Sequence, residues 1–170
     1  WTLLLMGVAL FITLSIGIPL GVYAARHRGT LFDQVVNVLV IIGISIFIPL
    51  LAFVLLYFFS FHLRITPVGG AYTPGGAPGG MVLDVLRHMA LPCLTLVIVY
   101  LASIVLFTRD SMLDALQEDY VRTARAKGAN DRSVTWGHAL RNALIPTVTV
   151  TGLMLGKMVA GAVLTETVFS

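Results

Sequence analysis

Residues 119–146, DYVRTARAKGANDRSVTWGHALRNALIP, form a polar and strongly basic segment between two apolar stretches. Together with Arg109, the segment holds six of the 11 Lys and Arg residues in the chain. Because Lys and Arg resist translocation, a basic segment between two membrane spans belongs on the cytoplasmic side. Helix-forming residues surround Ala124, Gly128 is placed to end that helix, and residues 130–131 can cap a second one. The segment therefore predicts two short helices, separated by a glycine, at the cytoplasmic face of a membrane.

The composition of the whole chain predicts a membrane protein. Of its 170 residues, 58% are apolar and 11% are charged, and the mean hydropathy is +0.94. An ordinary soluble domain carries about 25% charged residues, so a water-soluble fold fits poorly. The net charge of +3 does not predict nucleic-acid binding, because the basic residues lie at the expected cytoplasmic ends of spans.

The expected fold is all-α, a polytopic bundle of transmembrane helices. A helix crosses a bilayer core of roughly 30 Å with about 20 apolar residues. Four stretches meet this requirement, at about residues 1–25, 35–59, 91–108 and 147–169. Alternation of sides places residues 109–146 in the cytoplasm and residues 60–90 outside.

The external segment is expected to contain a loop and a short helix. Residues 64–80 include three Pro and six Gly, which rules out a regular element. Residues 81–89 have the spacing of an amphipathic helix with Asp84 and His88 on its polar side, and we expect this helix on the outer membrane surface. Pro92 would then lie in the first turn of the third span, where a missing N–H costs little.

Small residues recur at helical spacing in two of the expected spans. Gly17 and Gly21 flank a proline in the first span, and this pattern predicts either ordinary helix packing or a hinge. In the fourth span, Gly152, Gly156 and Ala160 recur every four residues and predict a groove for tight helix contact.

Three charged residues in or near the spans require an explanation. Lys157 lies near the middle of the fourth span, where a lysine costs about 2.5–3.5 kcal/mol on insertion scales. It is expected either to line a translocation path or to snorkel or pair with a carboxylate of another helix. Glu166 lies near the outer end of the same span and is a second candidate for the path. Asp33 is expected to cap a helix or to pair with an arginine.

The sequence does not predict a catalytic, metal or cofactor site. His27, His62, His88 and His138 are scattered, without the His-Glu-x-x-His spacing of a zinc site. The single cysteine, Cys93, excludes an internal disulfide. Residues 152–158 differ from a phosphate loop in glycine spacing and carry Met where Ser or Thr would bind magnesium. Nucleotide hydrolysis is therefore expected on another polypeptide.

The run YVRTARAKG from Tyr120 to Gly128, followed by HALRNALIP at residues 138–146, resembles the cytoplasmic signature loop of ABC-importer permeases. It is most similar to the dipeptide, oligopeptide, nickel and glutathione branch of that family. The general family pattern begins with Glu-Ala-Ala, whereas residues 122–124 are Arg-Thr-Ala, and the later proline is absent at residue 141. The resemblance extends from Gly17 to the end of the chain.

The resemblance implies a MetI-like permease fold with cytoplasmic coupling helices and no catalytic activity of its own. It implies that the loop at 114–146, with a helix from about 114 to 127, docks into an ATPase subunit. Tyr120 would serve as an aromatic anchor, and Ala124 with Gly128 would permit close approach. Charge-assisted hydrogen bonds would come from the basic residues Arg122, Arg125 and Lys127.

The resemblance also implies the partners and the location. The partners would be cytoplasmic ABC ATPase subunits, a sister permease and an extracytoplasmic substrate-binding protein, in the bacterial inner membrane. The substrate would be a peptide, nickel or glutathione. Because Trp1 opens directly into an apolar run and the chain ends abruptly at Ser170, we expect a fragment. The resemblance implies a longer subunit with at least one more span at each end.

Two other classes of function fit parts of the sequence. A secondary transporter or channel would use Lys157 and Glu166 for ion coupling and would need inverted internal repeats. A membrane scaffold would need no polar lining in the bundle. The basic residues of the loop could also serve only the positive-inside tendency and pair with anionic lipid head groups.

Overall fold

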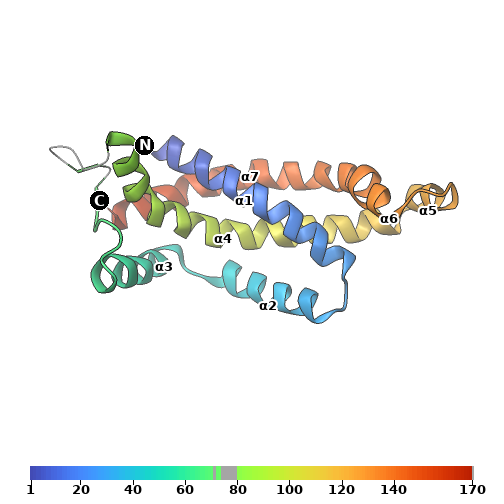
Figure 1. Ribbon diagram of the computed structural model, residues 1–170, viewed down its shortest axis with the longest axis horizontal. Coiled ribbons are helices and arrows are strands. Elements are labelled where there is room, and N and C mark those ends of the chain that lie inside the picture. Colours follow the sequence, from blue (N-terminus) through green and yellow to red (C-terminus); the bar gives the residue numbers. More distant parts are fainter. Residues whose placement is uncertain (71, 74–79, 170) are drawn as a thin grey trace. The chain divides into compact units, whose positions relative to one another are not determined.

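The computed structural model describes residues 1–70, 72–73 and 80–169, and every regular element in these ranges is a helix (Figure 1). The helices, in chain order, are α1 (Thr2–Arg26), α2 (Leu31–Ser45), α3 (Ile48–Leu55), η1 (Leu56–His62), α4 (Met81–Gln117), α5 (Asp119–Ala126), α6 (Asp131–Ser133), η2 (Val134–Ala139) and α7 (Leu140–Val168). The elements η1 and η2 are π-helical turns. The predicted all-α class is confirmed.

In the described part of the chain, three helical stretches are long and apolar enough to cross a membrane. They are α1, α4 and the stretch from α6 through α7. Helix α2 with α3 and η1 adds a fourth, broken candidate. The break lies at residues 46–47, because the ring of Pro49 would clash with the carbonyl of Ser45 in a continuous helix. The stretch 35–59, expected as one span, is therefore not one helix.

Helix α4 differs from the prediction at both ends. It runs without interruption over 37 residues, which corresponds to about 55 Å. The separate surface helix expected at 81–89 is its first part, and Pro92 lies in its interior instead of its first turn. At its other end, α4 continues past residue 108 to Gln117.

The polar face at the start of α4 is turned inward, contrary to the prediction. Asp84 and His88 are buried, whereas Val82 and Leu86 are exposed. The reason is a contact with the preceding loop. Thr73 donates its backbone N–H and its hydroxyl to the Asp84 carboxylate, at 2.6 and 2.9 Å.

The chain divides into two compact units. Unit 1 contains Trp1–Thr13, Ser45–Tyr100 and Leu155–Ser170, and unit 2 contains Leu14–Ile44 and Leu101–Met154. The helices α1, α4 and α7 each contribute to both units. Unit 1 has an apolar cluster formed by Ala52, Leu56, Leu91 and Phe169. Unit 2 has a larger one, formed by Val22, Ala25, Met112, Ala115, Val121, Val134, Ala139 and Ala143.

Within unit 2, two glycines let the backbones of α1 and α4 come close. A Cβ atom at Gly21 would lie 2.7 Å from Cβ of Thr108 and 2.9 Å from the carbonyl oxygen of Val105. A Cβ atom at Gly17 would lie 2.8 Å from Cγ2 of Ile104. Such distances are shorter than van der Waals contact, so only glycine fits at these positions without a shift of α4.

A buried ion pair joins α2 to α4 in the same unit. Arg109 donates from Nε to Oδ1 of Asp33 at 2.6 Å and from Nη2 to Oδ2 at 3.0 Å. The Asp33 carboxylate also accepts from the backbone N–H of Gly29 and from the side chain of Asn37. Of the two expectations for Asp33, the pairing with an arginine is therefore confirmed.

The close approach at Gly21 predicts a stability defect. Gly21→Leu should lower the free energy of unfolding by about 1–3 kcal/mol, because the backbone of α4 would have to move. Gly7→Leu on the same helix is the matched control, since no other part of the described chain lies within 4 Å of a Cβ atom placed at Gly7. Thermal unfolding of the purified full-length variants in detergent measures the effect, and equal losses in both variants would contradict it.

The ion pair predicts a second stability difference. Asp33→Asn should destabilise the protein by about 3–5 kcal/mol, because it leaves the largely buried Arg109 without its carboxylate. Asp110→Asn removes another carboxylate that contacts Arg109 at 3.0 Å but is more than half exposed, so its effect should be small. Detergent melting temperatures of both variants test this, and a similar loss for Asp110→Asn would count against it.

Candidate functional site

We call residues 118–139, which connect α4 to α7, the docking segment. At its start Glu118 has ψ 150°, an extended conformation that ends α4 and interrupts the helix expected from about 114 to 127. Helix α5 follows and ends at Ala126, and two residues later Gly128 has a φ of +84°, which favours glycine. Gly128 donates its N–H to the carbonyl of Arg125, and Ala129 donates to that of Ala124, as in a Schellman motif. The predicted helix stop at Gly128 is confirmed.

The second half of the docking segment begins with a side-chain cap. The backbone N–H of Ser133 donates to Oδ1 of Asn130 at 2.7 Å, so Asn130 is the N-cap of α6. The hydroxyl of Thr135 donates to the carbonyl of Asp131 and holds the next turn. The cap predicted at residues 130–131 is therefore provided by Asn130.

Apolar side chains fix α5 to the rest of unit 2, with Val121 fully buried and Tyr120 and Ala124 partly buried against the same cluster. Val121 is fully buried, and it belongs to the same cluster as Met112 of α4 and Val134 and Ala139 of η2. Sequence analysis did not select this residue. The sequence nevertheless indicated that Val121 is buried, because it is the only large aliphatic residue among the polar residues of α5.

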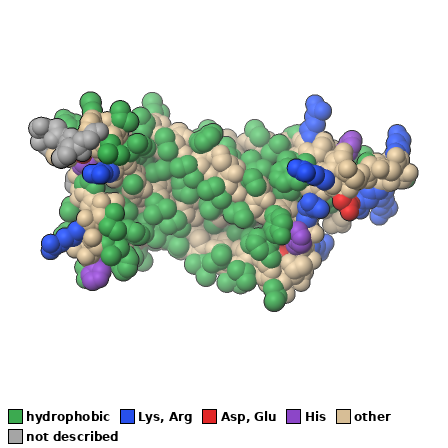
Figure 2. Space-filling model, viewed as in Figure 1, with side chains coloured by type: hydrophobic (Ala, Val, Ile, Leu, Met, Phe, Trp, Pro, Cys, Tyr) green, Lys and Arg blue, Asp and Glu red, His purple; other side chains and the backbone are tan. Residues whose placement is uncertain are grey.

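The basic residues of α5 and its end point away from this core. Arg122, Arg125 and Lys127 are all exposed, and Figure 2 shows Lys and Arg side chains projecting around α5 and α6. Arg122 lies 3.6 Å from Asp119 and Arg125 lies 3.7 Å from Asp131, in exposed pairs. Exposed pairs of this kind contribute about 0–1 kcal/mol, so these cations are available to a partner or to lipid head groups.

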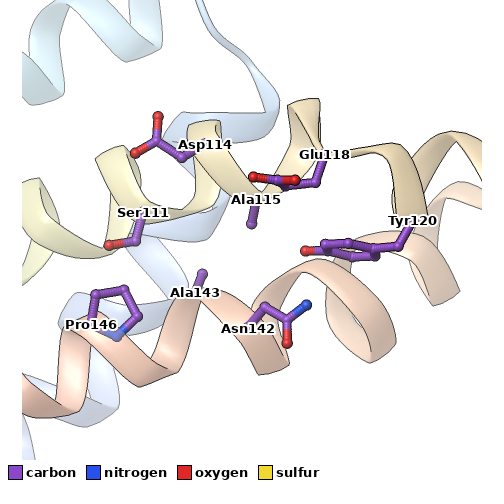
Figure 3. A pocket seen from close by; sticks show the side chains of 8 residues that line it. All are labelled: Ser111, Asp114, Ala115, Glu118, Tyr120, Asn142, Ala143 and Pro146. Atoms are coloured by element: carbon purple, nitrogen blue, oxygen red, sulfur yellow. The ribbon is translucent and has the colours of Figure 1, made fainter.

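Tyr120 lies between two pockets. The first, about 350 Å³, is called the acidic pocket and is lined by Ser111, Asp114, Ala115, Glu118, Tyr120, Asn142, Ala143 and Pro146 (Figure 3). The second, about 390 Å³, is lined by Tyr120, Thr123, Ala124, Lys127, Ala129 and His138. The structure thus brings Tyr120, Ala124 and Lys127 of the predicted docking residues to one pocket.

The two residues predicted for a translocation path lie on α7 and do not meet. The Lys157 side chain is exposed, and its carbonyl accepts a hydrogen bond from the Tyr100 hydroxyl at 2.8 Å. Thr2 donates its hydroxyl to Oε2 of Glu166 at 2.9 Å, whereas Oε1 of Glu166 is buried without a hydrogen-bond partner among the described residues. A role of either residue in a path stays a prediction.

The small-residue groove predicted on α7 has no neighbour in the described part of the chain. Nothing lies within 4 Å of a Cβ atom placed at Gly152 or Gly156, and Ala160 is exposed. The close contact occurs instead at Gly161, where a Cβ atom would lie 2.7 Å from the Tyr100 hydroxyl. The sequence pattern missed Gly161 because a repeat of four residues does not show which face of a helix is covered.

Potential metal ligands do not gather in the described residues. No group of three or more His, Cys, Asp or Glu side chains lies close enough there to hold a metal ion. Cys93 is buried and free, and the ring of His27 contacts the carbonyl of Tyr23 on the preceding turn. The expectation of no metal and no cofactor stays a prediction.

Comparison with known proteins agrees with this arrangement. Residues 17–170 match the family described as "Binding-protein-dependent transport system inner membrane component". The chain is 41% identical over 181 residues to the dipeptide transport system permease protein DppB of Escherichia coli K12, covering 95% of this chain and 53% of that protein. It is 44% identical over 172 residues to the di/tripeptide transport system permease protein DppB of Pseudomonas aeruginosa, covering 92% of this chain and 51% of that protein.

The chain spans about half the length of these relatives. The family match nevertheless covers most of the chain and includes unit 2 from Gly17 onward with the whole docking segment. The apolar helices and this match together make it a multi-pass membrane protein. The chain belongs to the family of binding-protein-dependent transport system inner membrane components.

Proposed function

We propose that the chain is part of the membrane subunit of an ATP-driven peptide importer, and that its docking segment binds a cytoplasmic ATPase. The observation that carries this proposal is the construction of α5. One side of this short helix is fixed by the buried Val121, and Arg122, Arg125 and the following Lys127 are exposed to solvent. A helix held in this way can transmit a movement, because it cannot tilt without moving the core to which Val121 belongs.

The proposed coupling follows from the neighbours of Val121. Met112 belongs to α4, and Val134 belongs to η2, which continues directly into α7. Closure of an ATPase around α5 would therefore displace the ends of both α4 and α7. Since both helices are long and apolar enough to span a membrane, their displacement would alter access to a path between them and other spans.

The substrate and the remaining partners are proposed from the relatives. These are named for the transport of dipeptides and di- or tripeptides, so we assign small peptides to this chain before nickel or glutathione. The further partners are an extracytoplasmic binding protein and a sister permease. Residues 109–146 would face the cytoplasm and residues 60–90 the outside of the inner membrane, with Lys157 and Glu166 on the path.

Removal of the three α5 charges tests the docking. In the assembled full-length complex, the triple variant Arg122→Gln, Arg125→Gln, Lys127→Gln should bind the ATPase roughly 100-fold more weakly, because charge-assisted hydrogen bonds are lost. The control is Arg26→Gln, Arg28→Gln, Arg141→Gln, which removes equal charge from other exposed positions of unit 2. Equal affinities of the two variants in nanodiscs would mean that the α5 charges serve lipid contacts only.

A bulky residue at Gly128 tests close approach of the partner. Among the described residues, nothing lies within 4 Å of a Cβ atom at Gly128, so this position is open and the bulk of Gly128→Trp would meet a docked partner. It should abolish substrate-stimulated ATP hydrolysis and leave membrane insertion intact. Gly128→Ala is the control, because it carries the same cost of about 1–2 kcal/mol for the left-handed conformation without the bulk. Normal coupling in the tryptophan variant would contradict docking at this face.

A further inference from the structure

The acidic pocket beside α5 is lined by two carboxylates at the junction between α4 and α5. Asp114 and Glu118 lie four residues apart near the end of α4, and Asn142 lies across the pocket on α7 (Figure 3). Both carboxylates are exposed to solvent, and neither forms an ion pair within the described part of the chain. The pocket of about 350 Å³ is large enough for the end of a side chain from another protein.

This absence of pairing is unusual for its surroundings. The other carboxylates near the docking segment each have an arginine within 4 Å, at Asp110, Asp119 and Asp131. Among the carboxylates in and near the docking segment, only Asp114 and Glu118 lack one within the described residues, although the segment is rich in Arg and Lys. The carboxylates of the pocket are therefore left available.

A second, independent observation points to a ligand in the pocket. The hydroxyl of Tyr120 is buried and has no hydrogen-bond partner among the described residues. Figure 3 shows that this hydroxyl points into the acidic pocket. A buried hydroxyl without a partner is unfavourable, and a polar group entering the pocket would supply the missing hydrogen bond.

We infer that the acidic pocket binds the guanidinium group of an arginine from the cytoplasmic ATPase, which rests on the proposed function. A guanidinium carries five N–H donors in a planar fork and no acceptor. The pocket offers the matching acceptors, which are the two carboxylates, the Tyr120 oxygen and the Asn142 amide oxygen.

The pocket would also define the orientation of the partner. The exposed face of α5 is positive and the adjacent pocket is negative, so a complementary surface must carry acidic groups next to a projecting arginine. Alternating charges of this kind exclude partners or registers that place like charges together. The pocket therefore adds specificity that the basic face of α5 alone does not provide.

The test compares neutralised carboxylates inside and outside the pocket in the full-length complex. Asp114→Asn with Glu118→Gln should weaken ATPase binding roughly 30-fold, because a charge-assisted contact is lost. Asp110→Asn removes a nearby carboxylate that lies outside both the pocket and the docking segment, and it should change affinity less than about twofold. The substitution at Glu118 should not unfold α5, because its side chain forms no cap hydrogen bond.

Two further measurements address the pocket itself. Tyr120→Phe removes only the hydroxyl and should weaken binding roughly three- to tenfold. A photo-crosslinking amino acid at Ser111 should attach to an ATPase peptide next to an arginine, and substitution of that arginine by Gln should reproduce the loss. Crosslinks only to lipid or to this chain, or to an ATPase segment without an arginine, would overturn the inference.

The outcomes separate the inference from the proposed function. If the wild-type protein does not bind the ATPase, both are overturned. Suppose that removal of the charges at Arg122, Arg125 and Lys127 abolishes binding, but the double variant Asp114→Asn, Glu118→Gln binds the ATPase like wild type. Docking then stands, and the arginine pocket is refuted. Melting temperatures of each variant, measured without the ATPase, confirm that a lost affinity does not come from unfolding.

Discussion

The burial of Val121 is the contact on which the docking segment depends. The segment is short, polar and interrupted at both Glu118 and Gly128, so its own helix propensity is too weak to hold it in place. The apolar cluster with Met112 and Val134 supplies the missing stabilisation. The same contact ties α5 to α4 and η2, so the docking segment is mechanically linked to the long apolar helices α4 and α7.

In lipid, the backbone N–H and C=O groups of the chain must form their hydrogen bonds within the protein. Helices meet this need within their own segment, and the regular elements described here are all helical. Many large apolar side chains are exposed on them, including Leu39, Ile41 and Ile42 of α2 and Leu153 of α7. Exposure of this kind fits contact with lipid or with another membrane subunit and would be unfavourable in water.

Two buried carboxylates have close partners. Asp33 is buried with Arg109, and buried Asp84 accepts two hydrogen bonds from Thr73. The acidic pocket differs, because its exposed carboxylates have no cation and the buried Tyr120 hydroxyl has no acceptor or donor among the described residues. Unpaired groups of this kind are expected at a surface that completes its contacts with another protein.

The sequence alone determined the helical class, the basic segment and its glycine stop, because each follows from local rules. Hydropathy over about 20 residues, the charge of Lys and Arg, and the left-handed freedom of Gly128 do not depend on distant residues. Only the tertiary structure decided which faces are covered. It turned Asp84 and His88 inward, placed the close contact at Gly161 instead of the predicted groove, and brought Asn142 opposite Asp114. These outcomes depend on neighbours far along the chain, and a periodic pattern does not identify them.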